Sequence, residues 1–243
     1  MSSTTNDSEA GKPGILFVAS TVLHPDALKP LDFVDWYENT HVQEVQSTGG
    51  ISGTQRYESL IFHSRHRDPT AASLENRHCE SDFLTIYNMP DLAFRESKAF
   101  RGLDGQSKPN EELLEKLFEQ TAFVTRFAQE VDVSGSSKAG SDPAPFLLSV
   151  CAPSITAAAN VLEKSSTGKS RAFSVREGSL LSEFNRSWEK VPSDIRLVEA
   201  NDISQLKELH KGLEGMEGLE VGFWRLRRSY DGSERTPAGW KPK

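Results

Sequence analysis

The stretch DFLTIYNMPDL, residues 82–92, decides the fold because a counterpart, DIRLVEANDI, follows at residues 194–203. Both stretches begin with Asp and continue through apolar and β-branched residues over the length of a strand. Both then reach an Asn and an Asp in front of a helical pattern. Strand–Asp–helix units occur in many α+β proteins, so one matched pair can arise by chance. The pair nevertheless indicates that the same unit occurs twice in the chain.

Further elements recur in the same order on either side of this pair. An apolar run at residues 15–19 has a counterpart at 146–150, and the closing strands occupy residues 123–127 and 219–224. The spacing between matched elements falls along the chain, so the loops of the second copy are shorter. Four ordered matches favour a duplication over chance, and the first copy reads strand–helix–strand–strand–helix–strand.

This order is typical of a ferredoxin-like α+β unit. A four-stranded sheet with helices on one face leaves its other face apolar, and a second such sheet can cover it. The sequence therefore predicts an α+β fold in which tandem ferredoxin-like halves pair their antiparallel sheets into a pseudo-dimeric α+β barrel. Residues 1–13 would form a flexible leader, 14–132 the first half with the site, 133–145 a Ser-, Gly- and Pro-rich linker, 146–230 the second half and 231–243 a tail.

Hydrophobic period and capping residues locate the individual elements. Asp32 is expected to cap the first helix, whose apolar residues recur at spacings of three and four until Gly49 and Gly50 end it. The other expected elements are a strand at 51–62, an exposed polar excursion at 63–80, a strand at 82–87, helices at 92–100 and 111–120, a strand at 122–133 with alternating faces, a short helix at 155–164 and part of a strand at 172–175.

The composition is that of an ordinary globular protein. Of 243 residues, 36% are hydrophobic and 26% are charged. No apolar run approaches the roughly 20 residues of a membrane-spanning helix, so no membrane partner is expected. The net charge is −7 and basic residues are scattered except for Arg225, Arg227 and Arg228, which argues against nucleic acid. A neutral or weakly charged small molecule, or another protein, is the expected partner. Cys79 and Cys151 are expected to be free thiols of a cytoplasmic protein.

Candidate chemistry concentrates in the first helix, around WYENTH at residues 36–41. The helical period places Tyr37, His41 and either Glu44 or Val45 on one strip. Histidine exchanges protons near neutral pH, and a neighbouring carboxylate can fix its tautomer, so His41 and Glu44 are the candidate catalytic residues. The alternative is that His41 only borders an amphipathic face and bonds to backbone or water, which is the commoner case for a lone helical histidine.

Aromatic residues of neighbouring strands are expected to complete a pocket beside this histidine. Such a pocket would stack on a planar ligand and form hydrogen bonds with its oxygens. The competing interpretation is core packing with polar tips at the surface. The candidate substrate-binding residues are Trp36, Tyr37, Arg56, Tyr57 and Tyr87.

The excursion at 63–80 contains residue types that bind metals, namely His63, His66, His78 and Cys79. A metal site needs converging ligands held in place by their own hydrogen bonds, and this segment shows no pattern that would hold them. Its arginines also oppose a cation. We therefore expect no metal site.

A strand, an aromatic-rich helix ending in Trp-Tyr-x3-His, and Gly-Gly-Ile-x5-Tyr in the next strand together resemble the EthD-like proteins of the dimeric α+β barrel superfamily. The later Phe-Leu-Thr-Ile-Tyr-x3-Asp is similar to the third strand of that family. Many fungal secondary-metabolite gene clusters contain chains of this kind. The resemblance implies a unit that pairs through its sheet, and it implies cyclisation, dehydration, decarboxylation or cofactor-free oxidation of polyketide-like or aromatic substrates. It also implies an acid–base histidine, a role that only His41 matches.

The second copy departs from the family pattern because its helix at 155–164 contains no His, Trp or Tyr. One site beside the first helix is therefore expected, with the second half serving as lid and scaffold. Family members that bind haem hold it through an axial histidine, but a single helical histidine without evident supporting groups gives little basis for haem. No cofactor is expected.

Two functions stay open at this point. The first is a cofactor-independent lyase, cyclase or isomerase of secondary metabolism, with His41 as the acid–base group. The second is a non-catalytic small-molecule-binding or accessory protein of a biosynthetic pathway. Because fusion lets the barrel form inside one chain, both a monomer with an internal pseudo-dimer and a homodimer are compatible with the sequence.

Overall fold

The chain was analysed as a computed structural model, which describes residues 10–60, 81–132, 142–153, 169–182, 185–188 and 194–231. The expected excursion at 63–80, with its four candidate metal ligands, lies outside these residues. So do the expected helix at 155–164 and most of the expected linker.

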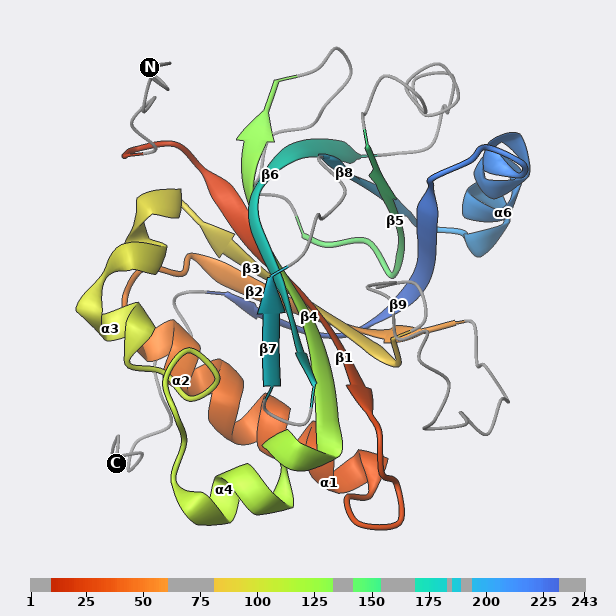
Figure 1. The fold of residues 1–243 in the computed structure, drawn as a ribbon. Coiled ribbons are helices and arrows are strands. Elements are labelled where there is room, and N and C mark those ends of the chain that lie inside the picture. Colours follow the sequence, from red (N-terminus) through yellow and green to blue (C-terminus); the bar gives the residue numbers. More distant parts are fainter. Residues whose placement is uncertain are drawn as a thin grey trace, which may run out of the picture.

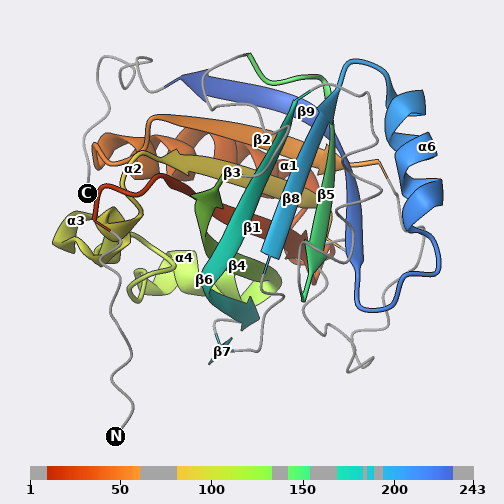
Figure 2. The same ribbon diagram turned by 90° about the horizontal axis from the view of Figure 1, so that it is seen from above.

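Eight antiparallel strands of the described ranges close into a barrel (Figures 1 and 2). Their order is β4-β1-β3-β2-β9-β5-β8-β6, and β6 pairs with β4 to complete the ring, while β7 extends the sheet beside β6. The strands are β1 (Gly14–Val22), β2 (Gly53–Ser59), β3 (Phe83–Met89), β4 (Thr121–Val131), β5 (Phe146–Ala152), β6 (Ser170–Ser182), β7 (Asn185–Trp188), β8 (Asp194–Ala200) and β9 (Glu220–Asp231).

The barrel consists of two four-stranded sheets with the same internal order. The first half contributes β4-β1-β3-β2 and the second contributes β9-β5-β8-β6, so each half has the 4-1-3-2 strand order of a ferredoxin-like unit. The halves meet at two seams, where β2 pairs with β9 and β4 pairs with β6. The predicted fold, a pseudo-dimeric α+β barrel of tandem ferredoxin-like halves, is confirmed.

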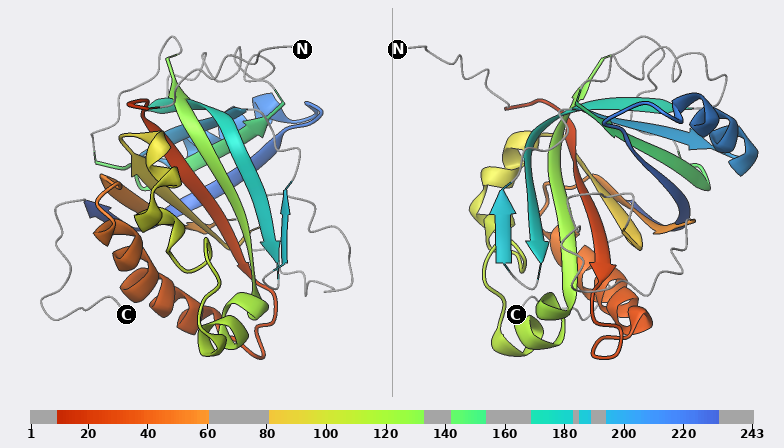
Figure 3. Two further views of the ribbon diagram at one scale, coloured as in Figure 1. Left: turned by 60° about the vertical axis from the view of Figure 1, so that its left-hand side comes forward. Right: turned by 45° about the vertical axis from the view of Figure 1, so that its right-hand side comes forward.

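The helices lie outside the barrel, with those of the first half on one side and α6 on the other (Figure 3). No helix of the described ranges has the length and apolar character needed to cross a membrane. The helical elements are α1 (Pro30–Trp36), the π-helical turn η1 (Tyr37–His41), α2 (Val42–Ser47), the 3-10 helix η3 (Leu92–Glu96), α3 (Lys98–Arg101), α4 (Glu111–Lys116), the 3-10 helix η4 (Phe118–Gln120) and α6 (Ile203–Leu213).

Strand alternation divides the buried side chains into an inner and an outer set. On β4, Phe123 and Phe127 pack outward against the helices of the first half, whereas Val124 and Ala128 pack inside the barrel, as predicted. A third cluster lies between the second sheet and α6. The molecule therefore has one inner core and two outer layers.

The repeated Asp of the two matched stretches has the same structural task in both halves. Asp91 accepts a hydrogen bond from the Ala93 amide at 3.0 Å and begins η3. Asp202 accepts one from the Ser204 amide at 2.8 Å and begins α6. The Asn–Asp ending that suggested duplication is thus a strand end followed by a helix cap.

Several expected elements differ in detail. The first helix begins at Pro30, so its N-cap is Lys29 and the expected cap Asp32 lies inside the first turn, since proline suits the start of a helix. The helix expected at 92–100 is two short helices, because Ser97 is extended and caps the second of them. The helix expected at 111–120 is interrupted at Leu117. The sequence did not predict β7, and β9 runs further than expected.

Candidate functional site

The first helix contains a π turn at its centre. The amide of Val42 donates to the carbonyl of Tyr37, five residues earlier, instead of to the residue four positions back. The helix nevertheless continues without a break, because α1, η1 and α2 follow one another directly. Single π turns of this kind occur often at functional sites. The sequence predicted a regular helix here, because hydrophobic spacing does not reveal one extra residue in a turn.

The π turn brings two aromatic rings to the His41 imidazole. Trp36 stacks on it with ring centroids 5.0 Å apart and planes inclined by 18°, and Tyr37 meets it edge-on at 5.1 Å. In a regular α-helix, five residues span about 1.4 turns, so Trp36 and His41 would point in different directions. The π turn therefore builds the three-ring cluster.

This cluster forms one wall of a cavity between the first sheet and its helices. The free volume is about 50 Å³, about a third of the ~150 Å³ of an engineered protein cavity that holds benzene. A larger ligand therefore requires side chains or a loop to move. The lining residues are Leu16, Val18, Trp36, Tyr37, His41, Val45, Tyr87, Phe100, Leu103, Asp104, Gly105, Gln106, Phe118, Phe123, Thr125 and Leu181.

A pair of buried phenols adds hydrogen-bonding capacity to this wall. The hydroxyls of Tyr37 and Tyr87 share one hydrogen bond of 3.3 Å, and the side chains are 1% and 0% exposed. Two O–H groups in one hydrogen bond leave one hydrogen unspent, which can be donated to a ligand oxygen. Burial raises the pKa of Tyr87 well above its ordinary value, and the Tyr37 hydroxyl raises it further. Tyr87 is therefore a neutral donor at physiological pH.

Arg56 lies behind Tyr37 rather than among the residues that line the cavity. Its guanidinium carbon is 4.0 Å from the centroid of the Tyr37 ring, and its Nη1 donates to the Thr85 hydroxyl at 2.7 Å. Nε and Nη2 have no hydrogen-bond partner among the described residues, although the side chain is fully buried. Burial lowers the pKa of Arg56, while the two phenols and Glu38 oppose that shift. The cation can thus act on the cavity through Tyr37.

Tyr57 does not join the other candidates. It follows Arg56 on β2 and therefore faces the opposite side of the sheet, where it packs in the barrel interior. The prediction grouped the two because a single sequence does not reveal which face of a strand the helices cover. Of the five candidate binding residues, Trp36, Tyr37 and Tyr87 line the cavity, Arg56 lies behind it, and Tyr57 lies in the inner core.

The expected partnership of His41 with Glu44 is loose. The imidazole Nδ1 lies 3.8 Å from Glu44 Oε2, which is longer than a hydrogen bond, and this nitrogen has no hydrogen-bond partner among the described residues. The imidazole is 15% exposed. No hydrogen bond from Glu44 therefore fixes the tautomer of His41.

The described ranges contain no cluster of three or more His, Cys, Asp or Glu residues that could hold a metal ion. Haem held by His41 would require the cavity to open, as any larger ligand would, because the free volume is about 50 Å³. The described residues that line the cavity offer an acid–base group and hydrogen-bond donors.

No protein-family model and no curated protein sequence matches the chain. Among solved structures, the chain is similar to an anthrone oxidase-like protein, with a TM-score of 0.53 and 8% identity, covering 95% of this chain and 97% of that one. It is also similar to a chlorite dismutase-like protein, with a TM-score of 0.51 and 9% identity, covering 89% and 95%. Both are dimeric α+β barrel proteins. This chain has the dimeric α+β barrel fold.

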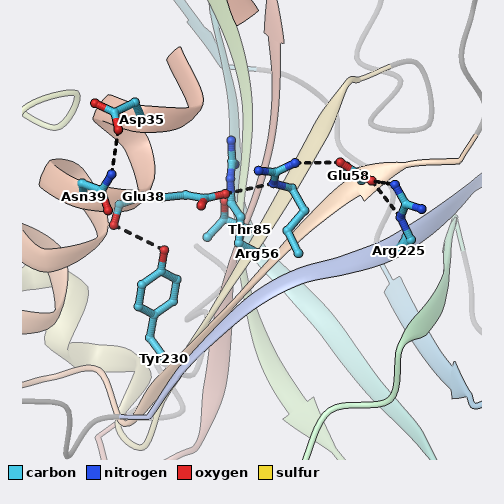
Figure 4. A network of polar contacts seen from close by, with 9 residues as sticks. Asp35, Glu38, Asn39, Arg56, Glu58, Thr85, Arg225 and Tyr230 are labelled. Atoms are coloured by element: carbon cyan, nitrogen blue, oxygen red, sulfur yellow. Dashed lines mark hydrogen bonds and ion pairs between the residues drawn. The ribbon is translucent and has the colours of Figure 1, made fainter. Parts of the chain in front are cut away.

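Two features of this α+β barrel at the site were not foreseen. The loop from Leu103 to Gln106 closes one side of the cavity, and Gly105 in it has φ +88° and lies beside the Phe118 ring, so a side chain there would be strained. The second feature is an ionic network in which Arg227 on β9 bridges Glu38 in η1 and Glu58 on β2. Both glutamates are labelled in Figure 4. The run of basic residues near the end of the chain was the available signal for this network.

Proposed function

We propose that the chain is a cofactor-independent enzyme that transforms a polyketide-like or aromatic small molecule, with His41 as its acid–base group. The observation that carries the proposal is the cavity wall itself: an imidazole set between Trp36 and Tyr37, next to a phenol pair with one unspent O–H. Such a wall combines a proton acceptor with a hydrogen-bond donor in an apolar space, where both are more effective than in water.

The reaction begins with proton transfer to the imidazole. His41 removes a proton from a carbon next to a carbonyl group, and the electron pair of the broken C–H bond moves onto the carbonyl oxygen as an enolate. The unspent O–H of the Tyr37–Tyr87 pair donates to that oxygen. The Arg56 guanidinium behind the Tyr37 ring favours negative charge on this side of the cavity.

A ring-forming reaction can follow from the enolate without any other reagent. The nucleophilic carbon attacks a second carbonyl carbon of the same substrate, a C–C bond forms, and the proton held by His41 passes to the new alkoxide. Loss of water then gives the dehydrated ring. Cyclisation, dehydration and decarboxylation all start from the same proton transfer or the same stabilised enolate, so one site can support each of them.

The shape and polarity of the cavity argue for a flat, mostly apolar substrate. Its walls are largely aliphatic and aromatic, and aromatic faces such as that of Trp36 stack on planar ligands. A polycyclic substrate exceeds the free volume, so the loop from Leu103 to Gln106 has to move on binding. The name of the anthrone oxidase-like neighbour fits such a substrate, and we propose an EthD-like, fungal secondary-metabolism assignment on the same grounds.

The proposal is tested by hydrogen–deuterium exchange at an acidic carbon, which needs no knowledge of the product. Anthrone, a planar tricyclic ketone with an acidic methylene group, is incubated in D₂O with the protein, and loss of the methylene proton signal is followed by NMR. The protein should accelerate exchange, and His41→Ala should lower the rate at least about tenfold while the fold persists. Unchanged exchange in that variant would remove His41 from the mechanism.

A matched control is available in the second half. His210 also lies on a helix packed against a sheet, where its ring meets that of Phe223 at 5.0 Å, and it is remote from the cavity lining. His210→Ala should leave the exchange rate unchanged. A similar loss in both variants would point to a general effect of the substitutions rather than to His41.

A non-catalytic binding or accessory role is the second candidate. The loose contact between His41 and Glu44 favours it, because a histidine acting as a base is usually oriented by a hydrogen bond. Under this role anthrone or a related tricyclic ketone binds, with quenching of tryptophan fluorescence, and the protein does not accelerate exchange. We place either role in the cytoplasm, in a monomer or a homodimer, and light scattering distinguishes the two masses.

A further inference from the structure

Glu38 connects the π turn to the second half of the chain. This residue is 8% exposed and follows Tyr37 in the turn. Its carboxylate accepts a hydrogen bond from Arg227 Nε at 3.0 Å, and its backbone carbonyl accepts one from the Tyr230 hydroxyl at 3.3 Å. Both donors lie on β9, the last strand of the barrel. A single strand of the second half therefore holds both the side chain and the backbone of Glu38.

The carbonyl contact is made where a π turn needs it. In an α-helix the Val42 amide would donate to the Glu38 carbonyl, but here it donates to Tyr37. The Glu38 carbonyl is thereby released from its helical partner. The side-chain amide of Gln43 also reaches this carbonyl, but that contact is long at 3.5 Å, whereas the Tyr230 hydroxyl lies at 3.3 Å. A buried carbonyl without a donor is unfavourable, so the Tyr230 hydroxyl stabilises the turn in its π form.

The carboxylate of Glu38 ties the π turn to the strands of the β2–β9 seam. Arg227 donates through Nε to Glu38 and through Nη1 to Glu58 on β2 at 2.8 Å, so it connects the helix to both strands of the seam. Arg225, two residues earlier, also pairs with Glu58, but within the described part of the chain it forms no hydrogen bond or ion pair with Glu38. The two arginines therefore differ in whether they touch the π turn, and they offer a matched comparison.

We propose that Arg227 and Tyr230 are positioning residues of the site: through Glu38 they keep the turn in its π form, and the π form places His41 between Trp36 and Tyr37. The inference rests on the proposed function only in treating His41 as the reacting group. It assigns the second half an active part in the site, beyond that of a lid and scaffold. Without the two contacts, the turn relaxes toward an α-helix and the stack of Trp36 on His41 opens.

The stack supplies a readout that needs no substrate. An imidazole lying flat on an indole has its carbon-bound protons shifted upfield in the NMR spectrum by the indole ring current, and His41→Gln identifies those signals by their loss. Tyr230→Phe, which removes only the hydroxyl, and Arg227→Met should each reduce the upfield shift of His41 by at least half. Arg225→Met should leave it unchanged.

The outcomes separate positioning from stability and from catalysis. Arg227→Met and Arg225→Met both lose an ion pair with Glu58, so a role confined to stability would lower both melting temperatures and leave the His41 shift alone. That result, or an unchanged shift in Tyr230→Phe, overturns the inference. Arg227→Lys, which keeps the charge, should restore part of the shift. If His41→Ala leaves anthrone exchange intact while the shifts change as expected, the proposed function fails and the positioning role stands.

Discussion

The two outer layers of the barrel share a strand order and differ in nearly everything packed on it. The outer layer of the first half holds aromatic rings, a phenol pair, a buried guanidinium and a cavity. In the described part of the second half, α6 packs mainly through leucines on an aliphatic sheet face. The same topology therefore supports a plain hydrophobic layer or a polar cavity, and individual side chains decide between them.

The clearest single difference is Tyr87 against Val198. Ile86 and Leu197 precede them and both face the barrel interior, so the two residues that follow occupy equivalent outward positions on β3 and β8. The tyrosine carries a hydroxyl to the cavity, whereas the valine packs against aliphatic neighbours.

Buried arginines provide a second comparison. Arg56 on β2 bonds through Nη1 to Thr85 on β3, and in the second half Arg196 on β8 bonds through Nε to Ser170 on β6 at 2.8 Å. Both thus connect the equivalent strand pair, from opposite members of it. Arg56 keeps two nitrogens that find no hydrogen-bond partner among the described residues, which is costly for stability and is expected where function requires it.

Replacing Tyr87 of the first layer by valine, the residue at the matching position of the second layer, should have the largest effect on the unfolding free energy. Tyr87→Val leaves a void beside the cavity and removes the partner of the Tyr37 hydroxyl, so the unfolding free energy should fall by roughly 2–4 kcal/mol. Urea unfolding followed by circular dichroism measures it. Tyr87→Phe, which keeps the ring, should cost only about 1 kcal/mol. Equal losses in the two variants would show that the hydroxyl contact, not the ring volume, stabilises this layer.

Substitution of the two buried arginines by methionine should affect the unfolding free energy differently. Arg56→Met removes a cation with two unsatisfied nitrogens, so the unfolding free energy should stay within about 1 kcal/mol of the wild type or rise. Arg196→Met breaks the Ser170 contact and should lower it by roughly 1–3 kcal/mol. Thermal and urea unfolding of both variants test this, and anthrone exchange should slow only for Arg56→Met. A large destabilisation by Arg56→Met would contradict the view that its charge is kept for function.

A substitution of Glu58 in the β2–β9 seam between the halves should have the smallest effect on the unfolding free energy, and this effect depends on pH. Burial alone would raise the pKa of Glu58, but hydrogen bonds from Arg225 and Arg227 lower it below its ordinary value of 4.5. A depressed carboxyl pKa stabilises the fold above pH 4.5, and this stabilisation is lost as the pH falls through the folded-state pKa. Glu58→Gln should therefore cost less than about 1 kcal/mol at pH 7 and progressively less toward pH 3. A cost that does not vary with pH would exclude the ion pairs as its source.

Much of the fold was predictable from the sequence because strands and caps repeat in it. The apolar runs that became β1 and β5 and the Asp residues that cap η3 and α6 were all visible. The matching of residues was off by one position, however. Asp194 was matched with Asp82, but the inward-facing Leu84 and Ile195 correspond, so Asp194 stands in the place of Phe83. A shared Asp is a weaker guide to register than the side of the sheet on which a residue is buried.

The candidate site was predictable only where its contacts join residues that are close in sequence. Residues close in sequence, such as Tyr37 and His41, could be grouped from helical spacing, whereas the stack of Trp36 on His41 depends on the π turn. The contacts of Arg227 and Tyr230 with Glu38 span most of the chain and depend on the seam between β2 and β9, which no local pattern specifies. The π turn was not predicted either, because the spacing of hydrophobic residues does not reveal one extra residue in a turn.

The two seams that close the barrel within one polypeptide also change what mutation can do to the molecule. In a symmetric homodimer, one codon change alters both subunits, so a substitution that improves one site is imposed on its twin. Here β2–β9 and β4–β6 join halves that are encoded separately along one gene. Each half can therefore follow its own evolutionary path, and a lineage can retain Tyr87 in one while Val198 occupies the matching position in the other.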